Sequence, residues 1–445
     1  MIAPYIFAVA IVAAGGAIWL GARDYSLNTK LVSCSTFFLW IYSFGSAWLS
    51  LSPAGRQILT VGSSTPNAGV RLTRTLCIGI VLFISLVVIA LNLETNRLVS
   101  KIGLLSVFLA PWVAILLVTF AHSSSLGLGL PLYFLFGVAL VLGRPQPISL
   151  CRTLGILTAT TAISSASLGI FFPGEGLTVR GTGATDVKAL IGDTLLAGPF
   201  GSPNTLGLCL ALGLPFVLAM RTRLSCLLVA AFVLVCIAWT ASRTALAASA
   251  VVLVLALIKD ARHVKFAALL GSGIAALLVV TIPVYNQSDP DSFTGRGRIW
   301  AGSFAAWRQA EIFGVNPDFY ESIAKINNPL GRTAFHGHNL LVTYFPVGGL
   351  FAVASIVVLL AAITWRAAQP GRLQKISAGL TVSLLITGIT ESTLDLRSPG
   401  YLGWLIWPGI GVVLLATTTA KNKNRPNLHE VSSTPDQLGR GRAMK

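Results

Sequence analysis

Long apolar runs alternate with short polar connectors along almost the whole chain, and this pattern predicts a bundle of membrane-spanning helices. The runs are 2–20, 31–51, 76–93, 103–121, 126–142 and 150–172, then 204–220, 224–239, 245–258, 266–284, 340–363, 376–389 and 401–417. Most approach the roughly 20 residues that cross a hydrocarbon core. We therefore predict an all-α polytopic integral membrane protein with about 12 or 13 transmembrane helices.

Two polar intervals interrupt this pattern. The interval 173–201 is rich in glycine but lacks the Lys-Ser/Thr ending of a P-loop, so it predicts no nucleotide site. The longer interval, 285–338, contains Ile299, Trp300, Phe304 and Trp307 at helical spacing. That spacing predicts an amphipathic helix lying on the membrane surface.

The pattern divides the chain into three parts. Residues 1–172 form a first set of transmembrane helices, and residues 173–420 form a second membrane region that includes the long loop 285–338. The tail 421–445 is polar and basic, and we expect it to be disordered.

Composition supports a membrane location and an orientation. The chain of 445 residues is 54% hydrophobic and 11% charged, and its net charge is +17. Its basic residues fall mainly in short connectors that alternation of the spans places on one side, which should be cytoplasmic. In the second half these residues are Arg221, Arg223, Lys259, Arg262, Lys265, Arg366, Arg372 and Lys375. Membrane lipids therefore explain the charge better than nucleic acid does.

The same alternation places the loops 173–201 and 285–338, with the turn at Ser242-Arg243, outside the membrane. In the first half, Arg56, Arg71 and Arg74 cluster in a connector that alternation also places outside, so the orientation there stays open. The six cysteines lie in or beside apolar spans without metal-site spacing. Because the spans hold almost no carboxylate or histidine, a proton-coupled transporter is disfavoured.

Arginines at the outer edge are candidate anion ligands. Arg243 precedes a short span, so its helix end is expected to be recessed, where a guanidinium suits a phosphate group. Arg296 and Arg298 flank a glycine at the start of the amphipathic helix, whose unpaired N–H groups also favour an anion. The alternative for each arginine is contact with lipid headgroups or water.

Histidines at the end of the long loop are candidate bases. His338 lies at the mouth of a span, is followed by Asn339, and can accept a proton from a hydroxyl near neutral pH. The alternative is an interfacial histidine bonded to a backbone carbonyl. His336 raises a metal site, which two histidines without a third ligand support weakly. Glu391, at the end of another span, either orders an arginine or marks the interface.

These residues resemble the O-antigen ligase and O-antigen polymerase family of bacterial glycan-transfer enzymes. The resemblance covers about 173–417, and it consists of Gly201-Ser202-Pro203-Asn204, Ser242-Arg243, Gly295-Arg296 with Trp300, Phe313-Gly314, and His338-Asn339 with Leu341. It implies a GT-C-like membrane glycosyltransferase in the cytoplasmic (inner) membrane, with its active site on the extracytoplasmic side.

The resemblance also implies a reaction and roles for residues. The donor is an undecaprenyl-diphosphate-linked glycan, the acceptor is a hydroxyl of a glycan, of lipid A core or of a protein, and transfer inverts the anomeric carbon without a metal or other cofactor. Arg243 and Arg296 would bind the diphosphate, and His338 would activate the acceptor. Arg298, His336, Asn339, Asn204 and Glu391 are possible supporting residues. The competing hypotheses are a flippase or exporter of the same lipid-linked glycan and a non-catalytic scaffold of the cell envelope.

Overall fold

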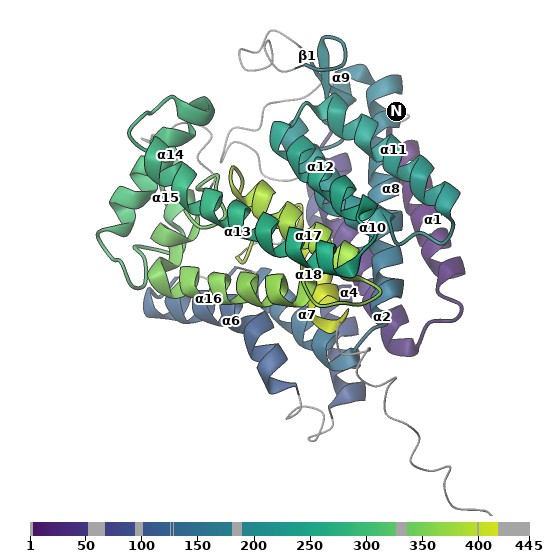
Figure 1. Cartoon of the computed structure of the whole chain (residues 1–445), viewed down its shortest axis with the longest axis horizontal. Helices are drawn as coiled ribbons and strands as arrows, with labels where there is room; N and C mark the ends of the chain where they lie inside the picture. Colours follow the sequence, from purple (N-terminus) through teal and green to yellow (C-terminus); the bar gives the residue numbers. More distant parts are fainter. Residues whose placement is uncertain are drawn as a thin grey trace, which may run out of the picture.

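The computed structural model describes residues 3–51, 67–93, 101–124, 126–127, 129–179, 189–325, 336–397 and 400–416 (Figure 1). Its first elements are α1 (Ala3–Gly21), α2 (Leu27–Trp40), the π-helical η1 (Ile41–Gly45), α3 (Ser46–Leu49), α4 (Ala68–Asn92), α6 (Ile102–Ala121), α7 (Gly129–Gly143), α8 (Pro147–Phe171) and α9 (Pro173–Gly176). Strands β1 (Leu177–Val179) and β2 (Thr194–Leu196) then form a small antiparallel pair with Leu177 opposite Leu196.

The second half is helical. Its elements are α10 (Pro203–Val217), α11 (Arg223–Thr240), α12 (Arg243–Leu257), α13 (Ala261–Asn286), α14 (Ser292–Trp307), α15 (Phe319–Lys325), α16 (Tyr344–Ala367), α17 (Gln374–Gly388) and α18 (Gly403–Ala416). The connector around Arg56, the loop segment 326–335 and the tail from Lys421, for which we made predictions, lie outside the described residues.

The helices confirm a polytopic membrane protein. Within the described residues, seven helical stretches are long and apolar enough to cross a membrane: α2 to α3, α4, α6, α8, α11, α13 and α16. Shorter apolar helices accompany them: α1, α7, α10, α12 and α18. The count of 12 or 13 spans stays a prediction.

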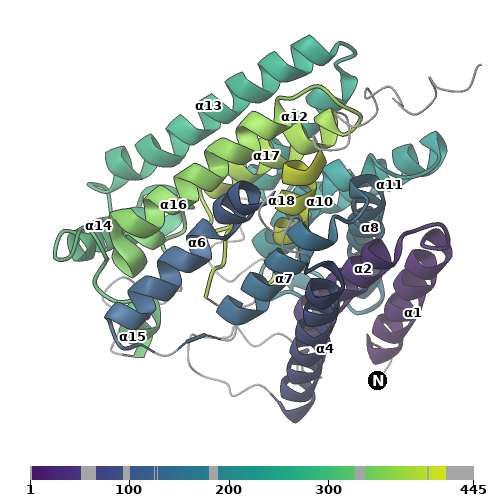
Figure 2. The ribbon, with the colours of Figure 1, turned by 90° about the horizontal axis from the view of Figure 1, so that it is seen from below.

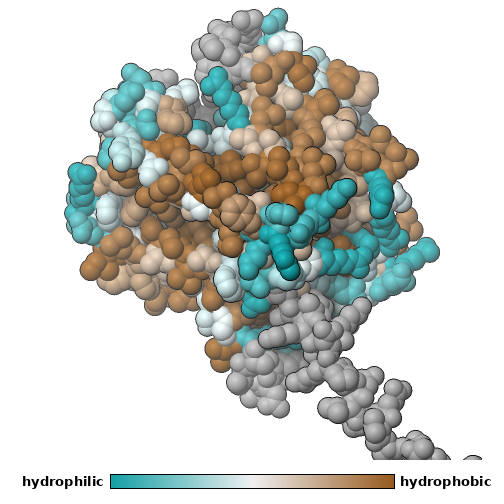
Figure 3. All heavy atoms as spheres, in the orientation of Figure 1, coloured by the Kyte–Doolittle hydropathy of each residue, from teal (hydrophilic) through white to brown (hydrophobic). Residues whose placement is uncertain are grey.

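Basic connectors from different parts of the chain meet on one face, which we call the basic face. Lys375 Nζ donates to the Ala256 carbonyl at 2.8 Å, which joins the start of α17 to the end of α12. Arg221 donates to the Gly21 carbonyl at 3.2 Å, which joins the α10–α11 connector to the end of α1. Figure 3 shows hydrophilic side chains gathered at the lower right and again at the upper left, with a broad hydrophobic band between them.

Helix α17 is the central helix of the second half. It packs against α10, α12, α13 and α16, so the ends of these helices are held around its own C-terminal end (Figures 1 and 2). Thr244 at the start of α12 hydrogen-bonds Thr390 just beyond α17 at 2.9 Å. Because Lys375 and Ala256 meet at the basic face, α12 and α17 are antiparallel. We call the opposite end, around Thr244 and Thr390, the site face.

The helix of the long loop differs from our expectation. The apolar side chains of α14 do not face lipid: Ile299, Trp300 and Phe304 are 2%, 0% and 7% exposed. Trp300 and Phe304 pack with Val342, and Phe304 also stacks near Phe345 of α16 with ring centroids 5.7 Å apart. An apolar stripe at helical spacing cannot tell a protein partner from a lipid partner, and here the partner is α16.

Candidate functional site

Glu391 joins an arginine and a histidine at the site face. Its Oε1 pairs with Arg296, and its Oε2 lies 3.3 Å from His338 Nδ1. The three side chains are 13% (Glu391), 19% (Arg296) and 15% (His338) exposed, so water screens the pairs little but still has access. A carboxylate between two nitrogen groups orients both, because each of its oxygens accepts from a different partner.

The backbone around His338 is tightly constrained. His338 has φ +44°, in the left-handed region that side chains other than glycine seldom adopt. The preceding Gly337 carbonyl accepts from Trp300 Nε1 at 3.0 Å, and its N–H donates to Thr343 at 3.1 Å. A Cβ on Gly337 would lie 2.6 Å from the Thr343 nitrogen, so only glycine fits. These contacts hold the imidazole toward Glu391.

Asn339 fastens this turn to two helices. Its amide nitrogen donates to the carbonyls of Val279 and Ile389 at 2.9 Å and 3.0 Å, and its oxygen accepts from the N–H groups of Leu341 and Val342. The Val279 carbonyl needs a partner because Pro283, four residues on in α13, has no N–H. Asn339 is fully buried, so it positions its neighbours and does not face a substrate.

Arg296 begins the right-handed part of α14. Phe293, Thr294 and Gly295 before it all have positive φ (50°, 66° and 84°), which makes a sharp left-handed turn. Gly297 packs so closely on the preceding turn that a Cβ would lie 1.9 Å from the Asp289 carbonyl oxygen. This turn directs the Arg296 side chain to Glu391, and the first N–H groups of the helix lie beside it.

The two arginines, Arg296 and Arg298, have different surroundings, and so do the two histidines, His336 and His338. Arg298 is 54% exposed and lies 3.7 Å from Asp291, away from Glu391. His336 uses Nδ1 to accept the backbone N–H of His338 at 3.0 Å, and its ring centroid is 4.2 Å from that of His338. Arg296 and His338 are therefore the members that meet at the carboxylate, and His336 supports the turn.

Electrostatics fix the charge states of two groups. Burial opposes the charge of Glu391, but the hydrogen bond from His338 and the charge of Arg296 outweigh it and lower its pKa to about 2. Burial lowers the pKa of His336 to about 3, and His338 and Arg296 act in the same direction. Glu391 is therefore an anion and His336 is neutral near pH 7.

His336 gives a pH dependence of stability. Between its ordinary pKa of 6.5 and about 3, the unfolded chain binds a proton that the folded chain does not, so the folded state loses stability as pH falls through this window. We expect His336→Asn, whose Oδ1 can replace Nδ1 as acceptor, to reduce the fall in Tm between about pH 7 and about pH 5. An equal fall in Tm in the wild type and in His336→Asn would contradict the lowered pKa of His336.

The site also contains a possible metal-ligand group. Ligand atoms of His336, His338 and Glu391 lie within 4.8 Å of one another. However, Arg296 already occupies one Glu391 oxygen, and the charge of its guanidinium repels a cation. The donor set as arranged therefore favours an anion beside Arg296 over a metal ion.

Arg243 lies at the same face as His338. It is the first residue of α12, next to Thr244, whose bond to Thr390 places it beside the segment that carries Glu391. It is exposed and makes no hydrogen bond or ion pair with the part of the chain that the structure describes. Arg243 and His338 therefore lie at the same end of the helix bundle.

Asn204 lies near the same end of the bundle. It is in the first turn of α10, where Ser202 caps its backbone N–H at 3.2 Å. One turn later, Gly207 packs so closely on the start of α12 that a Cβ would lie 2.8 Å from Ser242 Cβ. This contact places the N-termini of α10 and α12 side by side.

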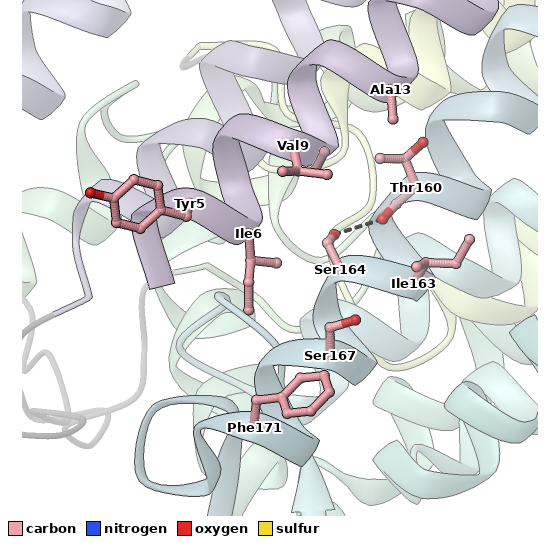
Figure 4. Close-up of a pocket in the computed structure, with 10 residues that line it drawn as sticks. Tyr5, Ile6, Val9, Ala13, Thr160, Ile163, Ser164, Ser167 and Phe171 are labelled. Carbon is pink, nitrogen blue, oxygen red and sulfur yellow. Dashed lines mark hydrogen bonds between the residues drawn. The ribbon is translucent and has the colours of Figure 1, made fainter. Parts of the chain in front are cut away.

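A cavity lies elsewhere, between α1 and α8 (Figure 4). Its volume is about 410 Å³, and it is lined mainly by apolar side chains such as Ile6, Val9 and Phe171. The Ser164 hydroxyl beside it donates to its own helix at 2.6 Å. No charged side chain of the described residues lines this cavity, so the charged cluster at Glu391 is the better candidate site.

The fold and the cluster define a polytopic helical membrane protein in which an arginine and a histidine from the long loop share one carboxylate. Residues 227–357 match the family model described as O-antigen ligase, Wzy_C, which supports the O-antigen ligase family predicted from the sequence and indicates a glycan-transferring membrane enzyme. No curated protein and no solved structure matches the chain. The match includes Arg243, Arg296 and His338, whereas Glu391 and Asn204 lie outside it.

Proposed function

We propose that this chain transfers a glycan from an undecaprenyl-diphosphate-linked donor to an acceptor hydroxyl at the site face. The observation that carries the proposal is the junction of Arg296 and His338 at Glu391, with Arg243 beside it. A reaction of this kind needs charge stabilisation of the diphosphate and removal of one proton from the acceptor. We assign the first task to Arg243 and Arg296 and the second to His338.

His338 is the proposed base. Its Nδ1 faces Glu391, so the tautomer that donates Nδ1–H to that carboxylate carries its basic lone pair on Nε2, and Nε2 is the atom we assign to accept the proton. The acceptor oxygen forms a bond to the anomeric carbon as its proton moves to Nε2. The bond from that carbon to the diphosphate oxygen breaks on the opposite face, which inverts the configuration. Glu391 stabilises the imidazolium that results, as an acid paired with a catalytic histidine does.

Arg243 and Arg296 are the proposed diphosphate ligands. A guanidinium keeps its charge at any physiological pH and presents five N–H donors. Arg296 donates some of its N–H groups to Glu391, whereas Arg243 donates none to the described residues. Their charge stabilises the leaving diphosphate, so the proposed reaction runs without a metal ion.

The distribution of charge suggests the location. If the basic face is cytoplasmic, as the excess of Lys and Arg in its connectors favours, the site face lies at the outer side of the cytoplasmic membrane. The donor diphosphate would then lie at the outer leaflet, where Arg243 begins α12.

The decisive experiment uses purified protein in detergent micelles with lipid-linked donor, acceptor and EDTA. We expect glycosylated acceptor and free undecaprenyl diphosphate, detected by mass spectrometry. A flippase makes neither product in micelles, because no bilayer separates its substrates. Absence of product from folded protein supplied with the donor and acceptor of its own cell would overturn the proposal, and product only after zinc is restored would overturn metal independence.

Arg243→Gln is expected to weaken the reaction through the donor. A lost charge-assisted bond to phosphate costs about 1.5–3 kcal/mol, which corresponds to about a ten- to hundredfold fall in kcat/KM for the donor. Arg298→Gln is the matched control, because Arg298 faces Asp291 at the same membrane face. Equal losses in the two variants would contradict a specific role for Arg243.

A further inference from the structure

A cavity with two arginines in its wall lies at the basic face, at the opposite end of the bundle from Glu391. It has a volume of about 300 Å³ and lies between the end of α1, the start of α8 and the α10–α11 connector. Its polar wall carries Arg152 and Arg221. Its apolar wall includes Leu20, Ile156 and Met220.

The two arginines are held in place by helix ends. Arg152 Nε donates to the Ala219 carbonyl beyond α10 at 3.3 Å, and Arg221 Nη2 donates to the carbonyl of Gly21, the last residue of α1, at 3.2 Å. Each bond satisfies a carbonyl that a helix end leaves unpaired. Each arginine uses one N–H in these bonds and forms no ion pair with a described residue, so most of their N–H donors remain available.

The charge of the cavity suits a single negative charge. Two guanidiniums contribute two positive charges, and the C-terminal ends of α1 and α10 each contribute roughly half a negative charge. The balance is about one positive charge, which a phosphodiester monoanion would neutralise. The apolar wall is also partly open to the membrane, because Leu20 is 59% exposed.

We propose that this cavity binds the phosphodiester headgroup of an anionic phospholipid from the leaflet at the basic face. The guanidiniums of Arg152 and Arg221 hold the phosphate, and Leu20 and Ile156 contact the first methylenes of the acyl chains. Basic pockets between transmembrane helices bind such headgroups. Because Arg152 and Arg221 already join α8 to the α10–α11 connector and that connector to α1, a phosphate bound to both arginines would hold the three segments together.

The test measures lipid binding to the delipidated full chain in detergent. Short-chain phosphatidylglycerol is expected to raise the Tm, whereas phosphatidylcholine and inorganic phosphate at matched ionic strength leave it unchanged. In the variant with both Arg152→Gln and Arg221→Gln, the apparent Kd for phosphatidylglycerol should rise about five-fold for each arginine removed. Arg223→Gln is the control, because Arg223 is exposed at the same face and does not line the cavity.

A second variant keeps the proposal testable if the double variant does not fold. Ala17 is exposed and lines the cavity, so Ala17→Phe should fill the cavity while both arginines remain. We expect it to lower phosphatidylglycerol binding as strongly as loss of one arginine. Wild-type affinity in Ala17→Phe, or a Tm rise with inorganic phosphate equal to that with phosphatidylglycerol, would overturn a lipid site.

Discussion

His338→Ala is expected to lower glycan transfer by about 10²–10⁴-fold while the protein stays folded in the membrane. The imidazole is the group placed to take the acceptor proton, and its loss leaves only water to do so. Donor binding should change little, because Arg243 and Arg296 remain. The measurement is the initial rate of product formation with purified protein, together with donor KM and the level of lipid-linked donor in cells.

Two other histidines provide controls for this variant. His263 is 76% exposed at the basic face and pairs weakly with Asp260, so His263→Ala should leave transfer unchanged. His336→Asn keeps the acceptor for the His338 backbone N–H, so it should lower transfer far less than His338→Ala does. If His336→Asn lowered transfer more than His338→Ala does, His336 and not His338 would be the base.

The sequence predicted the helical membrane fold because apolar length and charge placement are local properties of the chain. It also predicted that Arg243, Arg296 and His338 share one face, since each lies at a predicted span end or loop on one side of the membrane. The membrane side stays a prediction, but the bond from Thr244 to Thr390 holds the start of α12 beside the segment that carries Glu391.

What the sequence could not predict depends on contacts between distant segments. Glu391 lies 95 positions from Arg296 and 53 from His338, so no spacing relates it to either partner. Asn339 donates to the Val279 carbonyl of α13, and that carbonyl lacks its usual helical partner because Pro283 in the same helix has no N–H. Trp300 belonged to a stripe that we expected to face lipid, yet its Nε1 holds the Gly337 carbonyl beside His338.

Pairs of residues also needed geometry to be separated. Arg296 and Arg298 both lie at the start of one helix, and only the left-handed turn from Phe293 to Gly295 determines that the first points to Glu391. Sequence position alone gives the two arginines the same surroundings. The left-handed turn is therefore the feature that brings one arginine of this basic segment to Glu391.

Glu391→Gln is expected to lower transfer strongly, with an upper bound of about 10⁴-fold set by loss of the acid partner of a catalytic histidine. The neutral amide no longer favours the tautomer whose basic lone pair is on Nε2 of His338, and it does not stabilise the imidazolium. It also leaves the charge of Arg296 unpaired. We expect a loss of about 1–3 kcal/mol of stability, less than for a fully buried pair, because both side chains keep some contact with water.

A double variant separates the two effects of Glu391. Adding Arg296→Gln to Glu391→Gln removes the unpaired charge, so part of the lost stability should return, whereas transfer should stay low because a diphosphate ligand is also gone. Asp318→Asn is the matched control, since Asp318 pairs with Arg397 at 2.5 Å in a similarly sheltered position without a histidine. It should lower stability and retain most transfer. Wild-type transfer in Glu391→Gln would show that the carboxylate only holds the loop, and that His338 needs no acid partner.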